Sequence, residues 1–121
     1  MAYPRAFLLS AIAYALAGMA LGIYMGIGGD FFPSPIHAHI NLVGWVSLAL
    51  FGLIYRAYPR LAESGLAGIQ FWMAQAGALL LPVGIGLKLY RDHELVVILG
   101  SLLTIGAMAL FFAMALRDLR D

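Results

Sequence analysis

Four long runs of apolar residues, separated by short polar breaks, divide the chain from end to end. The runs cover residues 5–28, 36–58, 68–90 and 95–116. A hydrocarbon core about 30 Å thick is crossed by roughly 20 apolar residues in a helix, so each run is long enough to span a membrane. The breaks contain glycine, proline and charged residues, which end helices. The pattern predicts an all-α membrane protein whose four transmembrane helices form one bundle.

The composition supports a chain built for lipid rather than for water. Hydrophobic residues make up 64% of the chain and charged residues 11%, whereas soluble domains carry about 25% charged residues. Because the four runs use almost all 121 residues, we expect a single domain in the lipid bilayer. The absence of cysteine excludes disulfides, iron–sulfur clusters and thiolate metal sites. The net charge of +1 offers no basic surface for nucleic acid.

The charges between the runs predict the orientation, because lysine and arginine accumulate on the cytoplasmic side of a membrane. One side of the predicted bundle carries Arg5, Arg56, Arg60, Arg117 and Arg120. The other side carries only Lys88 and Arg91. We therefore expect both termini in the cytoplasm and the loops 29–35 and 91–94 outside.

Small residues recur at spacings of three or four along the first run, at Ala11, Ala15, Gly18, Gly22 and Gly26. Such a stripe lets another helix backbone approach closely. The partner helix belongs either to the same chain or to another copy.

Three histidines lie at the predicted outer side. His37 and His39 open the second run, and His93 precedes the fourth. Ionisable groups at membrane depth are costly, which makes a functional site one interpretation. Hydrated histidines at the membrane interface, near helix ends, are the other. On a regular helix His37 and His39 point about 160° apart, so they cannot bind one ion together.

Each histidine heads a different predicted helix face. His37 shares its face with Asn41, Gly44, Leu48 and Tyr55, and His39 with Val43, Val46 and Leu50. His93 leads Gly100, Thr104, Ala107 and Phe111. We expect the first face to point into the bundle. The second meets either lipid or an apolar cofactor. The small residues of the third suit a flat ligand or helix packing.

Haem b is the expected cofactor, with copper second. Haem needs one or two axial histidines in a slot between apolar helices, and His39, His93 and His37 are the available ligands. Catalytic zinc would need three ligands in one shell, which this spacing does not predict. Copper would use methionine as well, but the methionines within the spans are scattered. Lys88 and Arg91 either pair with haem propionates or act as ordinary flanking charges.

The second run carries a family resemblance. The stretch His37-Ala-His-Ile-Asn-Leu-Val-Gly-Trp45, followed by Leu-Ala-Leu-Phe-Gly at residues 48–52, resembles the second helix of subunit I in the haem–copper oxidase superfamily. It is most similar to the nitric oxide reductase and cbb3-type branches. The resemblance implies that His39 is the ligand of a low-spin haem near the outer face, with Asn41 as the polar residue after it. The paired histidines of that family's binuclear centre have no counterpart here, so oxidase or reductase chemistry does not carry over.

These observations favour a membrane haem b protein for electron transfer or binding of a diatomic gas (NO or O2), in the inner membrane of a bacterium or archaeon. The second axial ligand would be His93, His37 or a second copy of His39 in a homo-oligomer. The alternative is a cofactor-free accessory subunit of a respiratory complex.

Two further alternatives have less support in the sequence. A small proton-coupled exporter would need an acidic residue in the first span, and residues 6–28 contain none. Gln70 and Gln75 in the third span could contact a quinone headgroup, although polar contact between helices is the simpler interpretation.

Overall fold

The computed structural model describes residues 2–119, and every regular element in that range is a helix. The elements are α1 (Tyr3–Gly28), α2 (Ser34–His39), the π-helix η1 (Ile40–Ser47), α3 (Leu48–Ala57), α4 (Pro59–Glu63), α5 (Ala67–Arg91) and α6 (Leu95–Asp118). Arg120, which entered the orientation count, lies outside the described residues. Since α2, η1 and α3 are continuous, the long helical segments number four, as the apolar runs predict.

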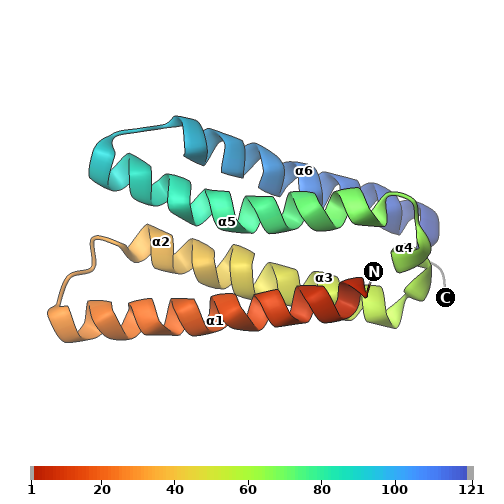
Figure 1. Ribbon diagram of the computed structural model, residues 1–121, viewed down its shortest axis with the longest axis horizontal. Helices are drawn as coiled ribbons and strands as arrows, with labels where there is room; N and C mark the ends of the chain where they lie inside the picture. The colour runs from red at the N-terminus through yellow and green to blue at the C-terminus, as the bar shows by residue number, and fades with distance from the viewer. Residues whose placement is uncertain (1, 120–121) are drawn as a thin grey trace.

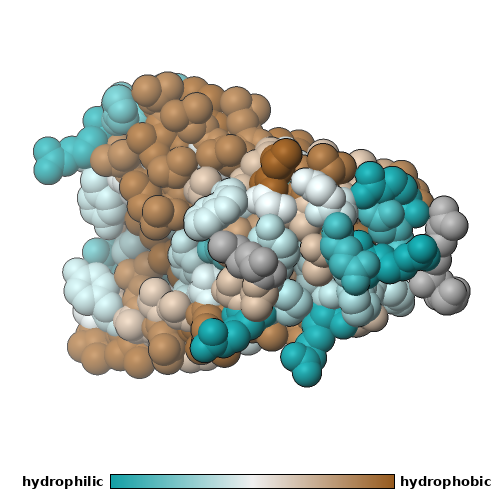
Figure 2. Space-filling model, turned by 45° about the vertical axis from the view of Figure 1, so that its right-hand side comes forward, coloured by the Kyte–Doolittle hydropathy of each residue, from teal (hydrophilic) through white to brown (hydrophobic). Residues whose placement is uncertain are grey.

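The four segments form two antiparallel hairpins that lie side by side (Figure 1). One hairpin consists of α1 with α2–η1–α3, and the other of α5 with α6. We call the end where α1 begins and α6 ends the termini end, and the opposite end the loop end. All four segments are long and apolar enough to cross a membrane, and large hydrophobic side chains such as Ile27 and Leu116 are exposed. In Figure 2 the hydrophilic residues gather toward the two ends. The chain is therefore an integral membrane protein.

Glycines set the packing of the first hairpin. A Cβ added at Gly18 would lie 2.5 Å from the Asn41 side chain, and one at Gly22 would lie 3.0 Å from His37. Gly44 leaves the same kind of space for the Tyr14 ring. The stripe of small residues on α1 thus packs against the next helix of the same chain. Gly26 has open space around it and takes no part in this contact.

The second hairpin is packed more tightly still. A Cβ at Gly100 would lie 2.5 Å from the backbone nitrogen of Leu81, and one at Gly77 would lie 2.6 Å from the Thr104 hydroxyl. Gly84 meets the backbone of Val97 directly. The small residues predicted on the face below His93 therefore serve helix packing at Gly100, where two backbones touch.

Aromatic side chains join the two hairpins at the termini end. The Phe7 ring lies 4.8 Å from that of Phe71, and the Phe51 ring lies 4.8 Å from that of Phe111, in edge-on contacts. Such contacts add about 0.5–1.5 kcal/mol each beyond simple burial. Gln75 also donates a hydrogen bond of 2.8 Å to Ser10, across the hairpins. Gln75 thus makes a polar contact between helices, which was the simpler of the two interpretations of this residue in the sequence.

Gln70 makes the second polar contact within the bundle. Its side chain is completely buried, and its Oε1 accepts a 3.0 Å hydrogen bond from the Tyr55 hydroxyl. The Nε2 of the same amide has no hydrogen-bond partner among the described residues. The Tyr55 hydroxyl is thus the group that satisfies the Gln70 side chain. Without it the whole buried amide would have no hydrogen-bond partner, which costs free energy of folding.

Replacing Tyr55 by phenylalanine is expected to lower the free energy of unfolding by about 1–3 kcal/mol, because the Gln70 carbonyl then loses the hydroxyl that donates to it. The measurement is an SDS titration followed by circular dichroism. The double variant Tyr55→Phe/Gln70→Leu is the control, since removing both polar groups should restore part of the loss. Equal stability of Tyr55→Phe and the unmodified protein would contradict the role given to this hydrogen bond.

Candidate functional site

His39 is the last residue of α2, and its ring nitrogen Nδ1 lies 2.7 Å from the backbone carbonyl oxygen of Pro35. A carbonyl oxygen can only accept, so Nδ1 carries the proton and donates it. In the neutral imidazole the other ring nitrogen, Nε2, is then the one that carries the lone pair. Histidines that bind metals commonly hold this arrangement, with the second nitrogen donating to a carbonyl that fixes the ring. The contact with Pro35 therefore leaves Nε2 as the ring nitrogen of His39 that could bind a metal.

The π-helix η1 begins directly after His39 and changes the direction of the residues that follow. Its wider turn bonds residue i to residue i+5, a geometry that is frequent at functional sites. The Ser47 hydroxyl follows this spacing, with a 2.8 Å bond to the carbonyl of Leu42.

The prediction of which residues share a helix face with His39 was wrong beyond Val43. Val46 and Leu50, expected below His39, are 41% and 51% exposed on the outside of the bundle. The wider turn of η1 brings Ser47 and Leu48 beneath His39 instead. Leu48 had been predicted to share the face of His37. It lines the cavity together with His39 instead, so that prediction was wrong as well.

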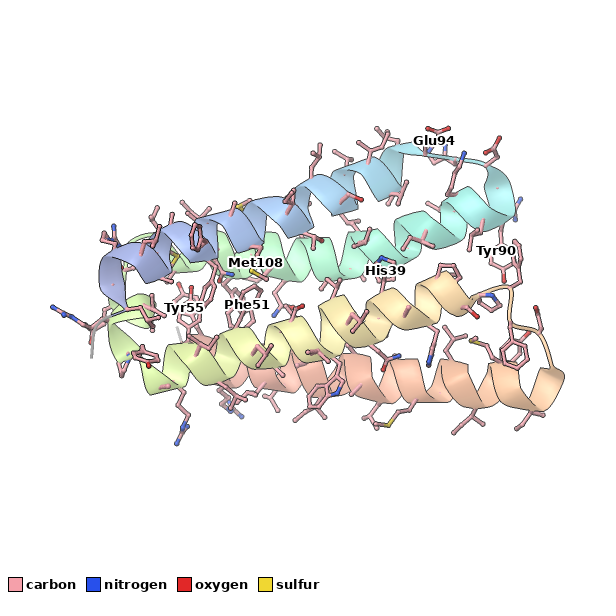
Figure 3. The ribbon with its side chains drawn as sticks, turned by 180° about the vertical axis from the view of Figure 1, so that it is seen from behind. His39, Phe51, Tyr55, Tyr90, Glu94 and Met108 are labelled. Carbon is pink, nitrogen blue, oxygen red and sulfur yellow. The ribbon has the colours of Figure 1, made fainter. Side chains whose placement is uncertain are left out.

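A cavity of about 370 Å³ lies between the two hairpins, with His39 in its wall (Figure 3). Its lining comes from α2–η1–α3 and from α5 and α6, and is mostly apolar: His39, Val43, Ser47, Leu48, Phe51, Ala74, Leu81, Ser101, Thr104, Ile105, Ala107 and Met108. Ala74 and Leu81 of α5 are buried and form its floor. A mostly apolar cavity with a few convergent polar groups is the usual form of a small-molecule site.

The cavity opens sideways along α6. Ser101, Ile105 and Met108 line it and are themselves exposed on the surface of the bundle. This surface lies within a span that is long enough to cross the membrane, so the opening faces the hydrocarbon region. A molecule dissolved in the lipid can therefore reach the cavity from the side.

His37 lies on the opposite side of the helix from His39. It packs against Gly22 of α1, and its Nδ1 is 3.4 Å from the Asn41 amide nitrogen. Asn41 donates a 2.8 Å hydrogen bond to the carbonyl of His37. Neither residue lines the cavity. The expected separation of the two histidines is present, and His37 and Asn41 serve contact between α1 and α2–η1.

His93 is exposed in the turn between α5 and α6 and does not line the cavity. The three histidines thus share the loop end without meeting. Within residues 2–119, no three histidine, cysteine, aspartate or glutamate side chains could hold one metal ion together. A copper or zinc site built from all three histidines is therefore not formed by this arrangement.

Lys88 and Arg91 also lie at the loop end, outside the cavity. The Lys88 ammonium is 2.7 Å from Asp92 and 3.1 Å from Glu94. Its hydrogen bond lowers the pKa of the Asp92 carboxyl below the ordinary value. Lys88 could bind a propionate only by giving up these partners, whereas the exposed Arg91 could turn toward one.

Several lining residues had not been singled out in the sequence. Leu81, Ser101 and Ile105 come from helices far from His39 along the chain, and no local pattern marks them. Thr104 and Ala107 had been placed on one face of the fourth run, but with His93 rather than His39. Only the pairing of the hairpins brings them to His39.

No protein-family model, curated protein or solved structure matches this chain.

Proposed function

We propose that this chain is a membrane haem b protein with His39 as an axial ligand, acting in electron transfer or in binding a diatomic gas. One observation carries the proposal. His39 lies in the wall of a mostly apolar cavity, and its Nδ1 donates to the Pro35 carbonyl at 2.7 Å, which leaves Nε2 as the ring nitrogen that could bind iron. Neutral imidazole is the usual axial ligand of haem iron, and an apolar slot between helices is the surrounding that haem requires.

One nitrogen donor in an apolar lining is the donor set that a haem with a single protein ligand would use. His39 supplies one nitrogen ligand, and Val43, Leu48 and Leu81 would contact the ring as apolar walls. The cavity volume of about 370 Å³ lies at the lower end of the range of roughly 300–1,000 Å³ for small-molecule sites. A porphyrin is larger than this, so part of its edge would extend through the opening along α6. Bound haem would supply an iron centre that exchanges electrons or takes an axial ligand.

The chain's own residues have three tasks in this proposal. His39 would hold the iron, and the Pro35 carbonyl orients the imidazole through its Nδ1. The aromatic contact of Phe51 with Phe111 closes the cavity toward the termini end and excludes water. Arg91 is the proposed partner of a propionate, with Lys88 as a second one once it leaves Asp92.

The proposal includes an orientation. The loop end would face outward and both termini the cytoplasm of a bacterial or archaeal cell, because the termini end carries more arginine. The haem would then lie toward the outer face, since His39 belongs to the loop half of the bundle (Figure 3). A homo-oligomer or a respiratory-chain protein is the proposed partner. Reduction of oxygen or nitric oxide is not part of the proposal, because no second metal centre is formed in the described residues.

The visible spectrum of the purified protein tests this proposal. We expect protein expressed with added haem and purified in mild detergent to show a Soret band that sharpens and shifts on reduction with dithionite. A flat spectrum would contradict haem binding and favour a cofactor-free accessory subunit. Copurification with a larger respiratory complex would then identify that role.

A further inference from the structure

We propose that Arg5 and Arg56 together bind the phosphate of an anionic phospholipid at the termini end of the bundle. This site is separate from that of the proposed function, because neither arginine lines the cavity that contains His39. Three features support it: the two arginines lie on adjoining helix ends, they have no partner among the described residues, and exposed leucines lie next to them on the membrane side.

Arg5 and Arg56 lie at the same end of two helices that pack against each other. Arg5 is in the first turn of α1, and Arg56 is in the last turn of α3. The two helices touch at Gly52, where an added Cβ would lie 3.1 Å from both the Pro4 carbonyl oxygen and the Leu8 side chain. Arg56 follows Gly52 by one helical turn, on the same side of α3, and Arg5 adjoins Pro4. The two arginines therefore flank the line of contact between α1 and α3.

Neither guanidinium group is used inside the protein. Both arginines are exposed, and neither makes an ion pair or a side-chain hydrogen bond to any residue in the range 2–119. Arg117 at the same end differs, because its guanidinium lies 2.6 Å from the Asp118 carboxylate and donates to the Ser64 hydroxyl at 2.6 Å. Arg5 and Arg56 are thus available to an anion from outside the chain.

The termini end carries an excess of positive charge, all of it from arginine. In Figure 2, where this end is turned toward the viewer, hydrophilic residues lie across it. A guanidinium presents a planar fork of donors that fits two phosphate oxygens, whereas a lysine ammonium acts as a point charge. An anionic phosphate is therefore favoured here by both charge and geometry. The charged residues of this end within 2–119 are Arg5, Arg56, Arg60, Arg117, Glu63 and Asp118.

The residues next to the two arginines favour a lipid over a soluble phosphate. Leu9 lies one helical turn from Arg5, and Leu53 one turn from Arg56, each toward the middle of the bundle. The two leucines are 56% and 52% exposed, within spans that are long enough to cross the membrane. A molecule whose phosphate contacts the arginines would lay its acyl chains along these leucines. An anionic head with apolar tails matches this surface.

Phosphatidylglycerol is the anionic probe, and phosphatidylcholine is the neutral comparison. The second lipid carries the same phosphate beside a cationic choline group, which the arginines repel. Native mass spectrometry of the full chain, released from a neutral detergent after each lipid is added, measures the lipid that stays bound. We expect the unmodified protein to bind phosphatidylglycerol about twentyfold more tightly, since each basic residue near an anionic lipid contributes roughly fivefold.

The double variant Arg5→Lys/Arg56→Lys keeps both charges and removes both planar forks. It should bind phosphatidylglycerol about tenfold more weakly, because charge-assisted hydrogen bonds to the phosphate are lost. Arg91→Lys is the matched control, since Arg91 is also an exposed arginine in the last turn of a span, but at the loop end. It should leave the affinity unchanged. The single variants Arg5→Lys and Arg56→Lys take the place of the double variant if circular dichroism shows that it has lost helix.

Three outcomes would overturn the proposed site. Equal binding of the two lipids by the unmodified protein would exclude an anionic lipid site without any variant. Unchanged affinity in the double lysine variant would mean that the lipid responds to charge alone and that the paired guanidinium groups do not hold its phosphate. An equal loss in Arg91→Lys would remove the site from the termini end. None of these measurements requires haem, so a protein without a Soret band would contradict the proposed function and leave this site intact.

Discussion

His39→Ala is expected to lose haem b almost completely, with the Soret absorbance per mole of protein falling by more than about tenfold, since even second-shell changes cost roughly 10–100-fold in metal affinity. The reason is that the variant leaves no nitrogen base among the residues that line the cavity. The Pro35 carbonyl, which accepts the bond from Nδ1, also loses its partner. The measurement compares haem content by visible absorption after identical expression with added haem.

His93→Ala is the matched control for this prediction. His93 is equally a histidine of the loop end, but it is exposed and distant from the cavity lining. It should keep the full haem content and an unchanged reduced spectrum. Adding free imidazole to His39→Ala should restore part of the Soret band, because the deleted side chain leaves space for it. Loss of haem in His93→Ala with retention in His39→Ala would assign the ligand to the turn instead.

Gly84→Ala is expected to have the largest effect on stability, with a loss of about 1–3 kcal/mol or more in the free energy of unfolding. A Cβ at this position would overlap the backbone of Val97, and backbone cannot move aside as a flexible side chain does. The helices α5 and α6 must therefore separate. Since both contribute to the floor and rim of the cavity, haem content should fall as well. SDS titration monitored by circular dichroism measures the first effect, and the Soret band the second.

Gly86→Ala provides the comparison on the same helix. Its Cβ would lie 3.6 Å from the end of the Ile36 side chain, which is an ordinary contact. Both substitutions change glycine to alanine within one helical turn, so helix propensity favours each to the same extent. A loss of stability confined to Gly84→Ala would show close backbone contact. Equal effects of the two variants would instead mean that α5 does not tolerate alanine for some other reason.

Local pattern was sufficient for the helices because membrane spans need little tertiary information. A run of about 20 apolar residues is helical in lipid whatever its neighbours are, since each backbone group must be satisfied within the segment. The observed helices begin and end within two residues of the expected spans. The opposition of His37 and His39 also follows from their spacing alone, and the structure places them against α1 and against the cavity.

Residue spacing alone did not predict which side chains of the second helix face the cavity. A helical wheel assumes a constant turn, and the π-helix after His39 breaks that assumption. Val46 and Leu50 consequently point outward, and Ser47 and Leu48 take their places. The amino-acid sequence of this segment has no proline and only one glycine that would mark the change. The wider turn became visible only in the backbone of the packed hairpin.

The number of helices, their approximate ends and the histidines worth testing could be obtained from the order of residues, because hydrophobicity and helical period are local properties. The cavity could not. It lies between two hairpins that each pack closely through their own glycines, as at Gly18 and Gly100, and that meet one another at the loop end through α2 and α5 and at the termini end through aromatic rings. Which residues face His39 across that gap depends on the relative placement of two rigid hairpins. That placement is set by contacts between residues far apart in the chain, such as Ser10 with Gln75, which no local pattern encodes.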